Sequence, residues 1–222
     1  MTSDLFDLLV QALGETLYMT ALSSVIGLAL GLPLGIVLTV TGRGHLAASP
    51  WWNKGLGLVI NLTRSFPSII LIIVALPLSR FLVGTTLGAT AALVPLSLSA
   101  APFLARIIEG ALKEVDKGKI EAALAGGARR GQAVLRILLP EALPSLIRGI
   151  TLSVISILGL TAIAGAIGSG GLGSLAIRFG YMRFRDDVMV ATVIVLVVLV
   201  QGIQTSGDLI ARHISKRRHV YE

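Results

Sequence analysis

Few residues of this 222-residue sequence have the types and the spacing that catalysis or metal binding requires. Cysteine is absent, which excludes disulfides, thiolate zinc sites and cysteine nucleophiles. The three histidines, His45, His213 and His219, lie too far apart in the sequence to indicate a metal cluster. The phosphate-binding loop GxxxxGK[ST] does not occur, so ATP hydrolysis by that route is excluded as well. We therefore expect a chain that is not an enzyme and that binds no metal or cofactor of its own.

One glycine spacing is similar to that of a dinucleotide-binding loop. Gly168, Gly170 and Gly173 fit GxGxxG, which binds dinucleotides where it connects a strand to a helix. Here the glycines follow an apolar segment of helical length, so the required strand is missing. The spacing favours instead a flexible turn at the end of that segment, because glycine accepts left-handed backbone conformations.

A second pattern is consistent with docking to another protein. It lies in a polar segment, residues 106–148, and fixes seven residues within a twenty-residue frame: Glu121, Ala122, Ala123, Gly127, Ile137, Leu139 and Pro140. Residues 121–130 favour a short helix, which Gly126 and Gly127 can end, and the small alanines allow a partner to come close. Glu121 is expected near the start of this helix, where the macrodipole favours a carboxylate. The alternative is an amphipathic helix that contacts lipid headgroups alone.

The same frame predicts where the next helix stops. Pro140 lacks the backbone N–H that a helix interior needs, so we expect it to limit any continuation of a second helix. The docking segment would then be a short helix between two turns, and it could move with a partner as a rigid body.

The elements that must position this segment are membrane spans. Hydrophobic residues make up 54% of the chain and charged residues 14%, whereas soluble domains carry about 25% charged residues. Five apolar windows approach the roughly 20 residues that a membrane helix needs, namely residues 17–40, 56–78, 82–105, 149–167 and 188–205. The expected fold class is all-α: a polytopic membrane protein with five transmembrane helices and a cytoplasmic loop at 106–148, in one domain covering 1–222.

The basic residues predict the orientation of these spans. Fifteen of the nineteen Lys and Arg residues fall on the side that holds residues 106–148 and the C-terminus. Because basic loops stay in the cytoplasm, the N-terminus is expected outside and the C-terminus inside. Trp51 and Trp52 fit an aromatic anchor at the inner interface. The net charge of +7 then faces anionic membrane lipid, and it gives no support to nucleic-acid binding.

The apolar windows carry no charge near their centres. Arg64 interrupts the second window, but it lies near one end, where its side chain is expected to snorkel to the interface. An ion-coupled transporter would need buried charged groups, so any work done by this chain is expected to be powered from outside the membrane. Gly27, Gly31 and Gly35 allow close approach of a helix from the same chain or from a second subunit. Residues 2–15 are expected to form a short helix along the outer interface.

The docking frame reads EAA-xxx-G-xxxxxxxxx-I-x-LP, and it resembles the EAA motif of ATP-binding-cassette (ABC) importer permeases at every defined position. The resemblance extends over nearly the whole chain, which is similar to the permease subunit of bacterial methionine ABC importers. It is carried by residues 64–71 (RSFPSIIL), 100–106 (AAPFLAR), 138–144 (LLPEALP), 170–173 (GGLG) and 204–208 (QTSGD).

The resemblance implies the type I ABC importer permease fold in the bacterial cytoplasmic membrane. It implies a homodimer of this chain, two copies of a cytoplasmic ABC ATPase that hold the ATP and magnesium, and an extracytoplasmic methionine-binding protein. ATP-driven alternating access would then import methionine. Two other functions stay open: an ABC importer permease for another amino acid or small polar solute, and an ATP-independent membrane channel or scaffold.

The residues that line the pathway are less well defined by the sequence. Span four carries the candidates, which are Ser153, Ser156, Thr161 and Ile163, with Ile163 as part of an apolar gate. Ordinary helix packing is the alternative role for the same residues.

Overall fold

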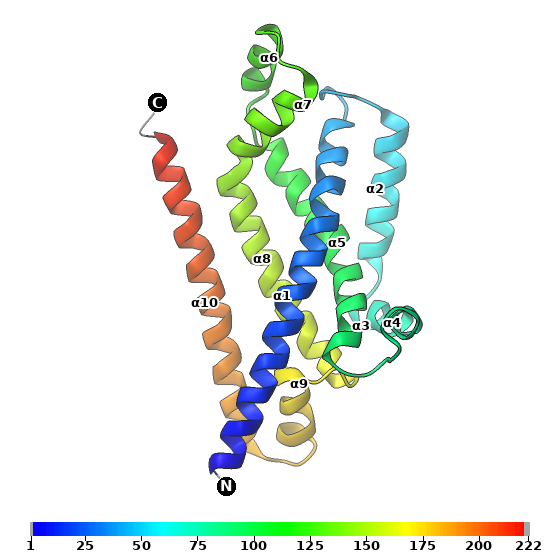
Figure 1. Cartoon of the computed structure of the whole chain (residues 1–222), viewed down its shortest axis with the longest axis vertical. Helices are drawn as coiled ribbons and strands as arrows, with labels where there is room; N and C mark the ends of the chain where they lie inside the picture. The colour runs from blue at the N-terminus through cyan, green and yellow to red at the C-terminus, as the bar shows by residue number, and fades with distance from the viewer. Residues whose placement is uncertain (1, 220–222) are drawn as a thin grey trace.

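The computed structural model describes the backbone of residues 2–219 and the side chains of residues 5–216, and this part of the chain is helical without a strand (Figure 1). Four helices are long: α1 (Thr2–Val40), α5 (Ala89–Lys113), α8 (Leu139–Ala166) and α10 (Asp186–His219). The shorter elements are α2 (Pro50–Ser65), α3 (Ser68–Val74), α4 (Leu76–Val83), α6 (Lys117–Ala125), α7 (Arg130–Ala133), the π-helical η1 (Val134–Leu138), α9 (Gly171–Leu175) and the π-helical η2 (Ala176–Tyr181).

Within the described residues, four helical segments are long and apolar enough to cross a membrane: Leu5–Val40, Ala89–Lys113, Arg130–Ala166 and Asp186–Lys216. The pair α2 and α3 passes the same test together but is bent by 100°. The count is therefore four spans, or five if the bent pair is one span. The expected all-α, polytopic fold is confirmed.

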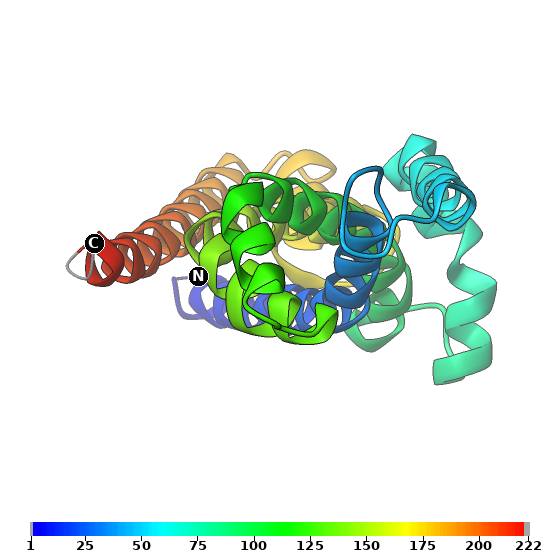
Figure 2. The same ribbon diagram turned by 90° about the horizontal axis from the view of Figure 1, so that it is seen from above.

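The bend between α2 and α3 has a local cause in the sequence. Phe66 ends α2 with an extended backbone, at φ −70° and ψ 132°. Proline disfavours helical torsions in the residue before it, and Pro67 also has no N–H to continue the ladder. The chain therefore leaves the axis of α2 at this point, and α2, α3 and α4 stand together on the side of the bundle opposite α10 (Figure 2).

Three expected boundaries differ from the structure. Residues 82 and 83 end α4 and residues 84–88 form a loop, so the third span begins at Ala89. The polar segment 106–148 is mostly helical, because α5 runs on to Lys113 and α8 starts at Leu139. Residues 2–15 do not form a separate interfacial helix but continue into α1 without a break. In the first case the helix begins inside its apolar window, and in the other two a helix extends past it; hydropathy alone detects neither.

Helices α1 and α5 form the central pair of the bundle. Gly27, Gly31 and Gly35 face α5, and a Cβ built on Gly31 would lie 2.8 Å from the Leu104 Cβ and 2.9 Å from the Ala101 carbonyl oxygen. Two helix backbones approach this closely only where small residues line the contact. The three glycines thus pack α1 against α5 within one chain.

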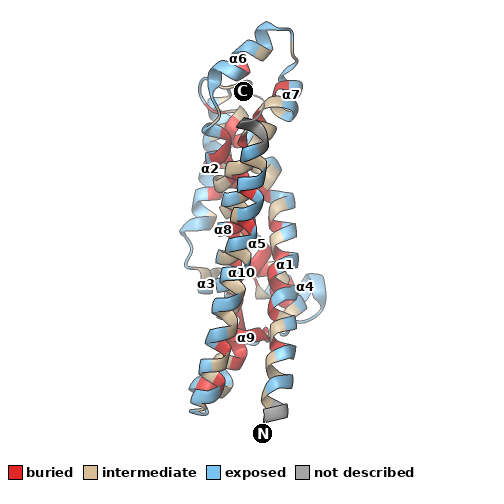
Figure 3. Ribbon diagram, turned by 90° about the vertical axis from the view of Figure 1, so that its left-hand side faces the viewer, coloured by how far each residue is buried: buried red, intermediate tan, exposed pale blue. Residues whose placement is uncertain are grey.

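One apolar cluster runs from this pair into the segment between α5 and α8. Its buried members are Ala100, Leu104, Ile108, Ala111, Leu112, Ile120, Leu138, Ala142, Leu146 and Ile157. They belong to α5, α6, η1 and α8. By contrast, α10 buries little of its surface, as Figure 3 shows by the pale colour along most of it.

The glycine turn after α8 is tied to α1. Gly168 and Gly170 have φ values of +101° and +86°, which only glycine adopts easily. The Gly171 N–H donates to the Glu15 carboxylate at 2.6 Å, and the Leu172 N–H donates to the Thr16 hydroxyl at 2.8 Å. Two side chains of α1 therefore satisfy the free N–H groups at the start of α9.

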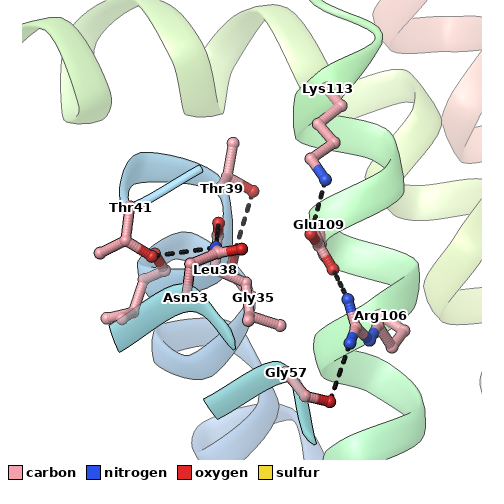
Figure 4. A network of polar contacts seen from close by, with 10 residues as sticks. Gly35, Leu38, Thr39, Thr41, Asn53, Gly57, Arg106, Glu109 and Lys113 are labelled. Atoms are coloured by element: carbon pink, nitrogen blue, oxygen red, sulfur yellow. Dashed lines mark hydrogen bonds and ion pairs between the residues drawn. The ribbon is translucent and has the colours of Figure 1, made fainter. Parts of the chain in front are cut away.

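A buried charge network joins α5 to α2 (Figure 4). The Glu109 carboxylate pairs with Arg106 and Lys113, each at 2.6 Å, and its side chain is 7% exposed. The Arg106 guanidinium also donates to the Gly57 carbonyl at 3.0 Å. A carboxylate removed from water requires such partners, because an unpaired buried charge is very costly.

A second polar contact holds the start of α2. The Asn53 amide donates to the Leu38 carbonyl at 2.7 Å and to the Thr41 hydroxyl at 3.1 Å, at the end of α1 (Figure 4). Together with the Arg106 contact, this fixes the first half of α2 against both central helices. The half of α2 that leads to the bend has a defined position as a result.

We expect Gly31→Leu to destabilise the fold, because its side chain would overlap α5. Overpacking of this kind costs about 1–3 kcal/mol. The measurement is the thermal unfolding of the detergent-purified protein. Gly14→Leu is the matched control on the same helix, since a Cβ at Gly14 meets no atom within 4 Å. Equal melting temperatures for the two variants would contradict the close α1–α5 contact.

We expect Glu109→Gln to lower the free energy of unfolding, because two cations lose their carboxylate. The loss should lie at the low end of the range of about 3–5 kcal/mol for breaking a buried ion pair. The low end applies since the Lys113 side chain is 48% exposed and its charge is partly screened. Thermal unfolding at neutral pH measures the loss. Asp7→Asn, an exposed acidic side chain on α1, is the control. A Glu109→Gln protein as stable as this control would show that the network contributes nothing.

Candidate functional site

The docking frame forms a short helix at one end of the bundle. α6 begins after Asp116, whose carboxylate accepts a hydrogen bond from the Gly118 N–H at 2.8 Å as an N-cap. It ends at Gly126, and Gly127 follows with φ +87°. The helix was expected at residues 121–130, so it starts four residues earlier, and Glu121 lies in its middle. The macrodipole argument for Glu121 at the helix start is therefore wrong.

Pro140 does not limit the second helix as expected. The chain is helical from Arg130 through η1 and α8 to Ala166. Pro140 lies in the first turn of α8, where its missing N–H costs little, and the preceding turn is π-helical. The wider π-turn lets the proline ring follow a helix instead of ending it.

The two halves of the frame differ in exposure. Glu121, Ala122 and Gly127 are exposed and Ala123 is half-buried, at the end of the molecule where Figure 3 shows mostly pale ribbon. Ile137, Leu139 and Pro140 are half-buried instead, and Leu139 packs against the apolar cluster. The first half thus forms a surface that another protein can reach, and the second half joins it to the bundle.

Contacts on both sides hold α6 to the bundle. Ile120 is buried in the apolar cluster, and Lys119 forms an ion pair with Glu141 of α8 at 3.1 Å. The Ser145 hydroxyl donates to Glu114, just after α5. A force on α6 therefore reaches both α5 and α8.

The loop between α1 and α2 also reaches this segment. A cavity of about 290 Å³ separates it from α6, and its lining includes His45, Lys117 and Glu121. Burial lowers the pKa of His45 below its usual value, and the nearby Lys117 and Lys113 ammonium groups lower it further. The imidazole is therefore neutral at pH 7, and it adds no charge to this basic end of the molecule.

A second cavity lies where the bent span meets α5 and α8. Its volume is about 250 Å³, and it is lined by Thr63, Arg64, Phe66, Ser68, Leu71, Ser99, Ala100, Phe103, Ser156, Ile157 and Leu160. We call it the central cavity, because Ser99 and Phe103 lie near the middle of α5. Small solutes are the only ligands that a space of this size accepts within one subunit.

Arg64 and the two tryptophans lie at opposite ends of α2. Trp51 and Trp52 are 88% and 76% exposed at the start of α2, as an aromatic anchor requires. Arg64 follows Pro50 by fourteen residues, which places it about 21 Å further along the helix, in the far half of an apolar layer about 30 Å thick that begins at the tryptophans.

An arginine at this depth costs roughly 2.5–3.5 kcal/mol, so it faces the interior of a bundle or water rather than lipid. Arg64 is exposed in the single chain, and its guanidinium lies 5.9 Å from the centre of the Phe103 ring. The face that carries the central cavity is therefore unsuited to contact with lipid tails. It is the face on which a polar pathway can form.

The structure brings one of the four predicted pathway residues to this cavity. Ser156 lines it. Ser153 and Thr161 are buried and donate hydrogen bonds to the carbonyls of Gly149 and Leu158. Ile163 packs against a separate apolar cluster around Met19 and Leu96. Arg64 also lines the cavity; the sequence singled it out but did not connect it with a pathway, although its charge within an apolar window was an available signal.

Known proteins resemble this chain over nearly its whole length. Residues 9–220 match the family described as binding-protein-dependent transport system inner membrane component. The chain is 44% identical over 211 residues to a probable D-methionine transport system permease protein, MetI, of Vibrio cholerae, covering 95% of this chain and 94% of that protein. It is 46% identical over 203 residues to the methionine import system permease protein MetP of Bacillus subtilis, covering 91% of each.

Solved structures share the arrangement of helices. An inward-facing conformation of the MetNI methionine ABC transporter matches with a TM-score of 0.95 and 42% identity, over 96% of this chain and 99% of that chain. An amino acid ABC transporter crystallised with histidines matches in fold, with a TM-score of 0.78 and 20% identity over 96% of each chain. The chain is a multi-pass helical bundle with an exposed EAA segment at one end, in agreement with these matches. It belongs to the family of binding-protein-dependent transport system inner membrane components, which are permease subunits of ABC transporters.

Proposed function

We propose that this chain is the permease subunit of an ABC importer that carries methionine across the bacterial cytoplasmic membrane. The observation that carries the proposal is the exposed EAA segment on α6, joined to the same apolar cluster that borders the central cavity. The cargo follows from the relatives, which are methionine permeases at 44% and 46% identity. This chain supplies the pathway, and ATP is bound and hydrolysed by a separate ATPase subunit.

The proposed assembly contains two copies of this chain and two ATPases, as the similarity to the MetNI complex supports. A methionine-binding protein would deliver cargo from outside. The basic residues that gather near α6 favour a cytoplasmic position for α6 and for the C-terminus, with the N-terminus outside. The EAA segment would then face the cytoplasmic ATPase.

The proposed mechanism is alternating access. When ATP closes the two ATPases, the α6 segments of the two copies move together and carry α5 and α8 with them. The central cavity then opens outward to receive methionine, and hydrolysis returns it to the inward-open state. The similarity to an inward-facing MetNI structure supports an inward-facing conformation for this structure. This proposal places Ser156 on the pathway. Ser153, Thr161 and Ile163 would shape α8 behind it.

The test is uptake by proteoliposomes that contain this chain, its ATPase and its binding protein. We expect uptake of radiolabelled methionine that requires ATP and the binding protein. Vesicles without ATP, and vesicles without the binding protein, are the two controls. ATP-dependent uptake of a different solute would overturn the cargo, and uptake without ATP would overturn the importer mechanism.

We expect Gly127→Asp and Glu121→Lys to abolish docking of the ATPase. The first change forces a side chain into a backbone with φ +87°, and the second reverses a charge on the exposed side of α6. Co-purification of the ATPase with the permease measures docking, and both variants should lose at least tenfold. Gly44→Asp is the matched control, since Gly44 is also exposed, has φ +75° and lies near α6 but outside the frame. Normal co-purification of both variants would contradict the docking role.

A further inference from the structure

Arg64 is a cation without a carboxylate partner inside the membrane region. Among the side chains that the structure describes, no Asp or Glu lies within ion-pair distance of it. The nearest described ion-pair network, around Glu109, uses Arg106 and Lys113 instead. A cation at this depth without a protein counter-ion is suited to an anionic group that arrives from outside the chain.

The hydroxyl groups of the central cavity can act as hydrogen-bond acceptors. The hydroxyls of Thr63, Ser99 and Ser156 each donate a hydrogen bond to the carbonyl four residues earlier on their own helix, at 3.0, 2.9 and 3.0 Å. Their protons are thus engaged, and their oxygen lone pairs remain available as acceptors toward the cavity. Three acceptors near one cation suit a ligand that also carries N–H donors.

Apart from Ser68, the rest of the lining is apolar. Leu71 of α3 and two residues of α8, Ile157 and Leu160, line the cavity together with the ring of Phe103 of α5. The central cavity therefore combines one fixed positive charge, several hydroxyl acceptors and an apolar wall. That set is complementary to the carboxylate, the ammonium and the apolar side chain of a zwitterionic amino acid.

We propose that Arg64 binds the α-carboxylate of the amino acid in transit, while the Thr63, Ser99 and Ser156 hydroxyls accept from its ammonium. The inference rests on the proposed import of an amino acid, and it adds a binding site within the membrane half of the transporter. A guanidinium offers two parallel N–H donors to a carboxylate, which a lysine ammonium cannot reproduce. The site holds the cargo after the binding protein has released it.

The first experiment measures methionine uptake by reconstituted transporters with Arg64→Gln or Arg64→Lys. We expect Arg64→Gln to lower the initial rate roughly tenfold to hundredfold, since a charge-assisted contact is lost. Arg64→Lys should fall between Arg64→Gln and the unaltered chain. Arg80→Gln is the matched control, because Arg80 is exposed on α4 of the same bent region and does not line the cavity.

A second experiment separates charge from folding by adding the charge after assembly. The chain has no cysteine, so Arg64→Cys can be modified selectively when cysteine-free partners are used. An aminoethyl methanethiosulfonate restores a positive charge, and a sulfonatoethyl reagent of similar size adds a negative one. We expect uptake to recover severalfold with the first reagent alone. Equal effects of the two reagents would overturn the carboxylate site.

A third measurement leaves Arg64 in place. In the complex without binding protein, a single Ser99→Cys thiol should react more slowly with such reagents when methionine is present. Methioninol, which lacks the carboxylate, should give at least fivefold weaker protection at the same concentration. Equal protection by both compounds would overturn the proposal, even if every Arg64 variant failed to fold.

The outcomes distinguish this site from the proposed function. If the unaltered chain imports no methionine, the proposed cargo is wrong whatever the variants do. If the unaltered chain imports methionine and Arg64→Gln assembles with the ATPase and imports it at the same rate, the importer stands and the Arg64 site is overturned.

Discussion

The cost of a charge in a layer of hydrocarbon determines how this chain is arranged. The carboxylate of Glu109 is paired with two cations from its own helix, and one of them reaches across to the Gly57 carbonyl of α2. Arg64 has no such pair and lies instead at the central cavity. The first charge is a structural tether, and the second defines a face that cannot contact lipid tails. The bundle therefore has one side suited to lipid and one suited to a pathway.

Apolar packing joins this face to the docking surface. Ala100 and Ile157 line the central cavity, and both belong to the cluster that also buries Ile120 of α6. Close-packed interiors transmit displacements because they leave little free volume. A movement of α6 by a partner would thus reach the cavity wall through side chains in contact, with the glycine face of α1 holding α5 in register. The tethers at Asn53 and Arg106 extend the same connection to α2.

Much of this arrangement followed from the sequence. Hydropathy found the apolar segments, although several helices run well past the predicted windows, and the residues from Glu121 to Pro140 matched the EAA motif of ABC importer permeases. The errors occurred where local rules were applied to residues whose tertiary setting differed. Pro140 was expected to end a helix, but it lies in a first turn, where the missing N–H is tolerated. Arg64 was considered only as a residue near an interface, but it also lines the central cavity beside Phe103.

The sequence by itself determined that the chain is helical, crosses a membrane and carries an EAA segment, because composition, periodicity and spacing are local properties. Only the tertiary structure decided which helices pack together and which charges meet. Gly27, Gly31 and Gly35 could have served a second subunit, but their contacts are with α5. The central cavity joins residues of α2, α3, α5 and α8 that are far apart along the chain. Such contacts depend on how the helices cross, which no single segment encodes, even though Pro67 sets the bend of one span locally.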